Sequence, residues 1–188
     1  MKKIIVSMHV TLDGFVAGPN GEMNWINLDA EMFDLVGEMT DNADTALYGR
    51  VTYEMMNGYW PKAGGQPDAS KHDIKHSSWY NQSQKIVLSK TLSESGLEKT
   101  KVIGENITEN IKKLKNGEGK NIMIFGRETT THYLFNEGLI DELWLFINPV
   151  VIGEGIPLFK EIRDITKLNL IESRQFSCGV VGIHYSLK

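Results

Sequence analysis

Two apolar runs in the sequence each end at a glycine that is followed by a helical pattern. The run 46–48 ends at Gly49, and the run 122–125 ends at Gly126. At the carboxyl end of a parallel strand, the free N–H groups of the following helix favour an anion. A residue without a Cβ also lets a phosphate approach the backbone. The pattern therefore predicts phosphate binding at both junctions, with a simple glycine turn as the alternative interpretation.

Side chains next to these glycines could extend such a site. Arg50 could hold a phosphate through its planar guanidinium and Thr52 through its hydroxyl, and residues 129–131 add three threonine hydroxyls. A third strand end, followed by Ser-Lys-Thr at 89–91, would suit a phosphate monoester. In each case an ordinary helix cap, a solvated first-turn residue or a polar turn is the competing interpretation.

The histidines and the cysteine give weaker signals. His72 and His76 have the spacing of metal ligands on a helix, but no third ligand is evident nearby, so we expect a solvated helix face. No metal site is predicted. The single cysteine, Cys178, excludes an internal disulfide and fits a reducing compartment.

Composition narrows the class of protein. The 188 residues, 41% of them hydrophobic, suit one domain covering 1–188 with a sizeable core. A net charge of −4 without a basic block argues against a nucleic-acid partner. The apolar run near the N-terminus is too short for a membrane span or a secretion signal. We therefore expect a cytoplasmic protein with a small-molecule partner and no membrane partner.

The elements that must position these residues alternate between strands and helices. The stretch 122–147 reads strand, glycine, helix, strand, which predicts a parallel crossover in a sheet covered by helices. Residues 168–176 and 180–187 predict an antiparallel hairpin at the sheet edge. We expect a loop at 58–66. The other strands are expected at 4–10, 44–48, 85–88 and 101–103, and the other helices at 29–40, from 50, at 68–79 and from 107 to about 116.

The ordered set of motifs resembles the dihydrofolate-reductase-like fold. Within it, the chain is most similar to the branch that includes the reductase domain of bacterial riboflavin biosynthesis. The resemblance implies an α/β, three-layer α-β-α fold with a mostly parallel central sheet and an antiparallel C-terminal hairpin. It also implies NADPH as cofactor and a homodimer. The segments that carry it are 12–17 (LDGFVA), 47–53 (LYGRVTY), 86–89 (IVLS), 124–127 (IFGR), 141–143 (DEL) and 149–155 (PVVIGEG).

The same resemblance assigns cofactor contacts to residues at four places in the chain. Val16 and Ala17 would line the nicotinamide through backbone groups. The phosphates would be held by Gly49, Arg50, Val51 and Thr52. The adenosine ribose and its 2′-phosphate would lie by Leu88, Ser89 and Lys90. The turn over the pyrophosphate would be formed by Phe125, Gly126, Arg127, Glu128 and Thr129. Preference for NADPH over NADH would then rest on Arg50 and Lys90.

Two positions depart from the family pattern. The family usually has a Gly-Gly pair joined by a cis peptide at the glycine turn, whereas Phe125 occupies the first position here. Aligned on Trp25, the position of the carboxylate of true dihydrofolate reductases is Ala30, which lies next to Asp29. Three catalytic candidates follow: Asp29, which could be only a helix N-cap, Asp13, which could be only part of an Asp-Gly turn, and Glu154.

The predicted activity is NADPH-dependent reduction of a small heterocycle, similar to 5-amino-6-(5-phosphoribosylamino)uracil reductase. The protein would hold the dihydronicotinamide carbon against an electrophilic C=N or C=O carbon, with a carboxylate or water giving the proton. The alternatives are dihydrofolate reductase activity on a pterin, or an NADPH-binding protein without turnover.

Overall fold

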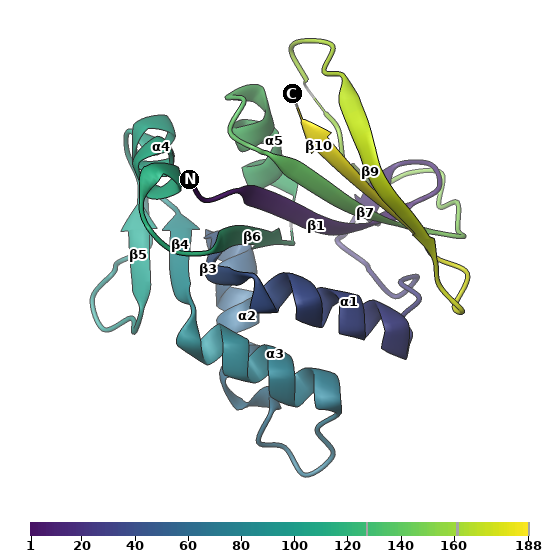
Figure 1. Cartoon of the computed structure of the whole chain (residues 1–188), viewed down its shortest axis with the longest axis horizontal. Helices are drawn as coiled ribbons and strands as arrows, with labels where there is room; N and C mark the ends of the chain where they lie inside the picture. Colours follow the sequence, from purple (N-terminus) through teal and green to yellow (C-terminus); the bar gives the residue numbers. More distant parts are fainter. Residues whose placement is uncertain (127, 161, 188) are drawn as a thin grey trace.

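The computed structural model describes residues 1–126, 128–160 and 162–187 and shows a central sheet with helices on both faces (Figure 1). The main sheet of this part of the chain has eight strands. In spatial order they are β5 (Thr100–Ile103), β4 (Gln84–Leu88), β3 (Ala43–Gly49), β6 (Asn121–Phe125), β1 (Ile4–Thr11), β7 (Glu142–Asn148), β10 (Val181–Leu187) and β9 (Leu168–Gln175).

Parallel pairing extends from β5 to β7, and the C-terminal hairpin is antiparallel. β1 lies in the middle, with β6 and β7 parallel to it on either side. The predicted crossover is therefore confirmed as parallel, although β1 separates its two strands. β10 pairs antiparallel with both β7 and β9, which confirms the predicted hairpin and places β9 at the sheet edge.

The helices divide between the two faces of the sheet. Helices α4 (Ile107–Asn116) and α5 (Glu128–Asn136) cover one face, and α1 (Ala30–Asp41), α2 (Arg50–Ala63) and α3 (Lys71–Gln82) cover the other (Figure 1). Successive side chains of a strand point to opposite faces. Ile4 accordingly joins the core beneath α4 and α5, whereas Ile5 joins the core beneath α1. The predicted three-layer α-β-α fold is confirmed.

Helix α2 corrects the expected loop at 58–66. The helix continues to Ala63 and contains both Gly58 and Pro61. Each of these residues disfavours a helix interior, by about 1 and about 3 kcal/mol respectively. Trp60 packs against His76 of α3, with ring centroids 4.1 Å apart. Pro61 lies in the last turn of the helix, where carbonyls are free of intrahelical bonds, and its carbonyl accepts from the Asn81 side chain of α3 at 3.2 Å. Packing against α3 therefore outweighs the local signals.

Two short strands form a second sheet next to β1. β2 (Phe15–Ala17) pairs antiparallel with β8 (Ile156–Pro157). Asp29 caps α1 by accepting a hydrogen bond from the Met32 amide at 2.9 Å, so the predicted N-cap is confirmed.

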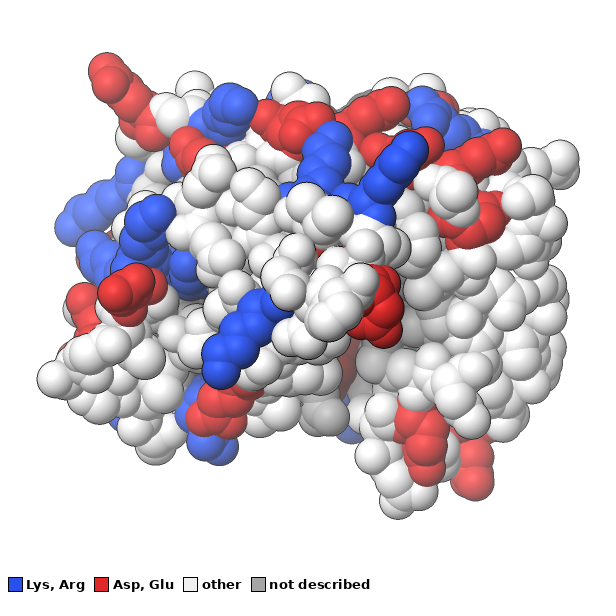
Figure 2. Space-filling model, turned by 90° about the horizontal axis from the view of Figure 1, so that it is seen from below, with Lys and Arg blue, Asp and Glu red and all other residues white. Residues whose placement is uncertain are grey.

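The molecular surface mixes charges of both signs. Figure 2 shows Lys and Arg side chains next to Asp and Glu over the face that lies below in Figure 1, without a broad area of one sign. Among the described helices, none combines the length and the apolar character that crossing a membrane requires.

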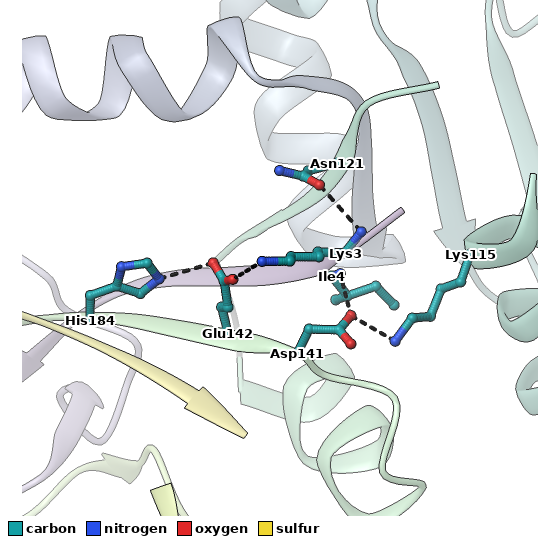
Figure 3. A network of polar contacts seen from close by, with 7 residues as sticks. All are labelled: Lys3, Ile4, Lys115, Asn121, Asp141, Glu142 and His184. Carbon is teal, nitrogen blue, oxygen red and sulfur yellow. Dashed lines mark hydrogen bonds and ion pairs between the residues drawn. The ribbon is translucent and has the colours of Figure 1, made fainter. Parts of the chain in front are cut away.

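Ionic contacts fix β1 to β7 at the edge of the sheet where β1 begins (Figure 3). Asp141 Oδ2 accepts from the Ile4 amide and from Lys115 Nζ, both at 2.7 Å. Beside it, Glu142 accepts from Lys3 at 2.6 Å and contacts His184 Nε2 at 3.0 Å. Burial acts to raise the pKa of Glu142, but the hydrogen bonds from Lys3 and His184 lower it overall. These side chains hold the strand that leads into the site.

We predict that Asp141→Ala destabilises the protein by about 2–3 kcal/mol, because it removes the counter-ion of Lys115 and the acceptor of the buried Ile4 amide. The side chain of Lys115 is only 10% exposed. Urea denaturation of the variant and the wild type measures the change.

The matched control is Asp41→Ala, which removes the carboxylate of an equally short but exposed pair with Lys75. Loss of that pair should cost at most about 1 kcal/mol. Equal effects of the two substitutions would contradict the role assigned to Asp141.

Candidate functional site

A cavity of about 310 Å³ lies at the end of β6 and beside the middle of β1, between the sheet and helices α1, α2 and α3. The β2 strand and the loop before α1 complete its wall. Most of the lining side chains are apolar or aromatic. The lining residues are Ser7, Met8, His9, Val16, Ala17, Gly21, Met23, Leu28, Met32, Phe33, Val36, Met55, Met56, Trp60, His72, His76, Phe125, Gly126, Glu128 and Ile156.

The two glycine junctions lie against each other beside this cavity. A Cβ at Gly49 would lie 2.9 Å from Thr130 Oγ1, at the start of α5. A Cβ at Gly126 would overlap the side-chain methyl of Thr52, at the start of α2, and Gly126 has φ +110°. Each glycine thus packs against the first turn of the helix that follows the other. The N-termini of α2 and α5 are brought together at the edge of the sheet where a phosphate is expected.

Five of the predicted cofactor residues line the cavity itself: Val16, Ala17, Phe125, Gly126 and Glu128. Val16 and Ala17 belong to β2, and the other three lie at the end of β6 and the start of α5. The described residues contain no cis peptide bond, so the peptide between Phe125 and Gly126 is trans.

The remaining predicted phosphate ligands lie around the paired helix starts. Arg50 and Val51 are exposed, and Arg50 forms an ion pair with Glu54 at 3.1 Å, one helical turn away. Thr52 is buried, whereas Thr129 is exposed. Arg127, which the resemblance places over the pyrophosphate, falls outside the described residues.

The predicted ribose-binding residues lie at the end of β4. Leu88 is half-buried, and Ser89 Oγ accepts from the amides of Thr91 and Leu92 at 3.2 and 3.0 Å, which closes a turn. Lys90 is exposed and lines a separate hollow with residues 104–109 and Tyr133. This hollow lies on the side of β4 away from the large cavity, next to β5 and α4.

None of the three predicted catalytic carboxylates lines the cavity. Asp13 accepts hydrogen bonds from the amides of Ile152 and Gly153, at 3.2 and 2.8 Å, and so ties two loops together. Hydrogen bonds from Thr11 and from these amides lower the pKa of Asp13. Glu154 is exposed. Neither of these two carboxylates therefore contacts the cavity that a substrate would fill.

Asp29 is occupied by contacts within the fold. Besides capping α1, it accepts from Ser177 Oγ at 2.8 Å and from the Cys178 amide at 3.1 Å. Burial acts to raise the pKa of Asp29, but the hydrogen bonds from Met32, Ser177 and Cys178 lower it overall. Its carboxylate joins the first turn of α1 to the turn of the C-terminal hairpin.

Sequence reasoning missed the histidines that face the cavity. The expectation of a solvated helix face at His72 and His76 is wrong, because His76 is only 6% exposed. Phe33 stacks on His72 with ring centroids 4.2 Å apart, and Trp60 lies against His76. Burial lowers the pKa of His76 to about 3 and that of His9 to about 4, so both rings are neutral at pH 7. These contacts join residues of different helices, so they become visible only when the packing of α3 on α1 and α2 is known.

Some buried polar atoms beside the cavity have no hydrogen-bond partner within the described protein. They include His76 Nδ1 and Glu128 Oε2, both from lining residues, and Thr131 Oγ1 in the first turn of α5. Buried polar groups are nearly always paired, so such atoms indicate where a ligand would supply the partner.

The fold and the paired glycine junctions define a dihydrofolate-reductase-like protein with its candidate site at the carboxyl edge of the parallel strands. Residues 2–182 match the family model described as the RibD C-terminal domain, and the chain belongs to that family.

The similarity to known proteins extends over nearly the whole chain. The uncharacterized protein YyaP of Bacillus subtilis (strain 168) is 38% identical over 186 residues, covering 98% of this chain and 94% of YyaP. A crystal structure of a protein assigned to riboflavin biosynthesis from Shewanella sp. PV-4 is similar with a TM-score of 0.73 and 25% identity, covering 99% of both chains.

A third similarity supports the fold alone. The Thermotoga maritima diaminohydroxyphosphoribosylaminopyrimidine deaminase/5-amino-6-(5-phosphoribosylamino)uracil reductase matches with a TM-score of 0.68 at 13% identity. All of this chain is covered, but only 57% of that protein.

The buried histidines predict that acid destabilises the folded state. Below about pH 6.5 the unfolded chain binds protons at His9 and His76, whereas the folded protein binds them only near pH 4 and pH 3. The free energy of unfolding should therefore fall as the pH decreases. Between pH 7 and pH 5, His76 alone should account for a loss of about 2 kcal/mol.

Urea denaturation at both pH values checks this expectation, with His76→Phe as the test variant. The variant should lose less stability on acidification than the wild type. An unchanged pH dependence in His76→Phe would show that the histidine is protonated in the folded protein without cost.

Proposed function

We propose that the protein is an NADPH-dependent oxidoreductase that reduces a small heterocycle. The observation that carries the proposal is the meeting of the N-termini of α2 and α5 at two glycines, next to a mostly apolar cavity. Helix N-termini bind phosphates, and an apolar cavity suits a nicotinamide and a flat substrate. Membership of the RibD C-terminal domain family supports a reductase.

The residues present fit this cofactor. The absence of a Cβ at Gly49 and Gly126 lets α2 and α5 begin close together, so that the backbone amides of both helix starts could hold one diphosphate. Val16 and Ala17 would lie against the nicotinamide at the cavity wall. When bound, NADPH supplies a hydride, and the protein's part is to hold the acceptor carbon close to it and to exclude water.

Preference for NADPH would come from cations at the exposed end of the site. Arg50 forms an ion pair with Glu54 in which both side chains are exposed, so the pair contributes at most about 1 kcal/mol to stability. Arg50 therefore stays available to a phosphate. Lys90, at the exposed end of β4, would contact the 2′-phosphate of the adenosine ribose.

The substrate belongs to the pyrimidine or pterin class of heterocycles in this proposal, with 5-amino-6-(5-phosphoribosylamino)uracil as the reference compound of the riboflavin branch. Water, or Glu128 at the cavity wall, would provide the proton. One observation favours the alternative of an NADPH-binding protein without turnover: Asp13, Asp29 and Glu154 do not line the cavity.

Calorimetric titration with NADPH and NADH tests the cofactor site. NADPH should bind at least tenfold more tightly than NADH, and Arg50→Ala or Lys90→Ala should reduce this preference. Gly126→Ala should lower NADPH affinity at least tenfold, because its methyl group would overlap Thr52 and push the starts of α2 and α5 apart.

Gly138→Ala is the matched control, because Gly138 also has a positive φ, +63°, but nothing lies within 4 Å of the place that an alanine methyl would take there. It should keep the affinity of the wild type. If neither nucleotide binds the wild type, the reductase proposal is wrong. Binding without NADPH oxidation across pyrimidines, pterins and quinones would favour the alternative without turnover.

A further inference from the structure

The wall of the cavity that faces away from β2 consists of apolar and aromatic side chains of α1, α2 and α3. Met32, Phe33 and Val36 come from α1, and the facing residues of α2 are Met55, Met56 and Trp60. Where the wall reaches the surface it stays apolar: Met23, Leu28 and Met55 are 47%, 49% and 56% exposed. A ligand therefore meets apolar groups from the mouth of the cavity to its floor.

Positive charge is missing from the described part of this wall. Among the described lining residues there is no Lys or Arg, and Glu128 is acidic. His9 and His76, whose pKa values burial lowers to about 4 and about 3, are neutral at pH 7. Placing a phosphate monoester in such surroundings is unfavourable, because its charge of about −2 would lose water without gaining a cation.

Stacked rings provide the matching attraction for a flat neutral ligand. Phe33 and His72 stack at 4.2 Å, His72 lies edge-on to Trp60 at 5.7 Å, and Trp60 lies against His76 at 4.1 Å. His76 in turn contacts Phe125 at 5.6 Å. These rings form a continuous aromatic wall on which a further planar ring can stack.

One polar contact is available inside this aromatic wall. His76 is only 6% exposed, and its Nδ1 atom has no hydrogen-bond partner within the described protein. A neutral imidazole nitrogen can accept from an N–H or O–H group or donate to a carbonyl. A ligand with one such group at its edge would pair this atom.

We propose that the substrate is an electrically neutral, unphosphorylated planar heterocycle, such as an unsubstituted bicyclic one, that stacks on Trp60 with a polar edge directed at His76. This inference rests on the proposed function and narrows it to substrates without a phosphate. In the reaction, the hydride of NADPH forms a C–H bond at the C=N or C=O carbon. The π electrons move to the nitrogen or oxygen, which takes a proton from water, and NADP⁺ is released.

Two probes that share one ring test the inference by calorimetry, without nucleotide. The probes are 2-naphthol, which is neutral and carries an O–H group, and 2-naphthyl phosphate. We expect 2-naphthol to bind at least tenfold more tightly. Equal or tighter binding of the phosphate, or no binding of 2-naphthol, would overturn the inference.

Substitutions in the cavity wall test whether 2-naphthol binds there. Trp60→Ala should weaken 2-naphthol binding at least tenfold, and His76→Phe, which keeps a ring but removes the nitrogen, about fivefold. Met55→Lys should reduce the preference for the neutral probe at least threefold. Ile74→Lys, which adds the same charge to α3 at an exposed position outside the cavity, should leave the preference unchanged. Full affinity in Trp60→Ala would overturn the inference.

The nucleotide titrations separate this inference from the proposed function. If 2-naphthol binds as expected but NADPH does not, the proposed function fails and the neutral-ring site remains. If NADPH binds and is oxidised with phosphorylated substrates in preference to neutral ones, the proposed function stands and the inference fails.

Discussion

The contact between two strand-to-helix junctions determines the geometry of the site. Gly49 packs against Thr130, and Gly126 packs against Thr52, so each junction limits the position of the other helix. A side chain at either glycine would separate α2 from α5 and move both helix N-termini. Because β3 and β6 are neighbours in the sheet, this contact also fixes the carboxyl ends of the strands around which the cavity forms.

Two kinds of structure meet at the cavity. On one side are strand ends and β2, whose positions are set by the sheet and by ionic contacts such as that of Asp141 with Lys115. On the other side are α1, α2 and α3, whose lining residues are mostly methionines and residues with aromatic rings. The first side presents backbone groups, which suit phosphates and a carboxamide. The second side presents methionines and rings, which suit a flat apolar molecule.

Local patterns were sufficient to predict much of the fold. A β-rich run predicted β1, two further strand-like runs predicted the hairpin, and Asp29 was recognised as a cap because an N-cap depends only on its own helix. The continuation of α2 through Pro61 and the burial of His76 were not predicted, because both depend on contacts between α2 and α3. The cavity was not predicted either, because methionines at helical spacing give the same sequence pattern whether they face a core or a ligand.

The position of α3 has an evolutionary consequence. It follows α2 and precedes β4, pairs with no strand, and reaches the cavity through His72 and His76. Substitutions at these two positions would change the shape and polarity of one wall while leaving Gly49 and Gly126 untouched. The wall that α3 contributes can therefore vary among descendants of a common ancestor without disturbing the contact between the two glycine junctions.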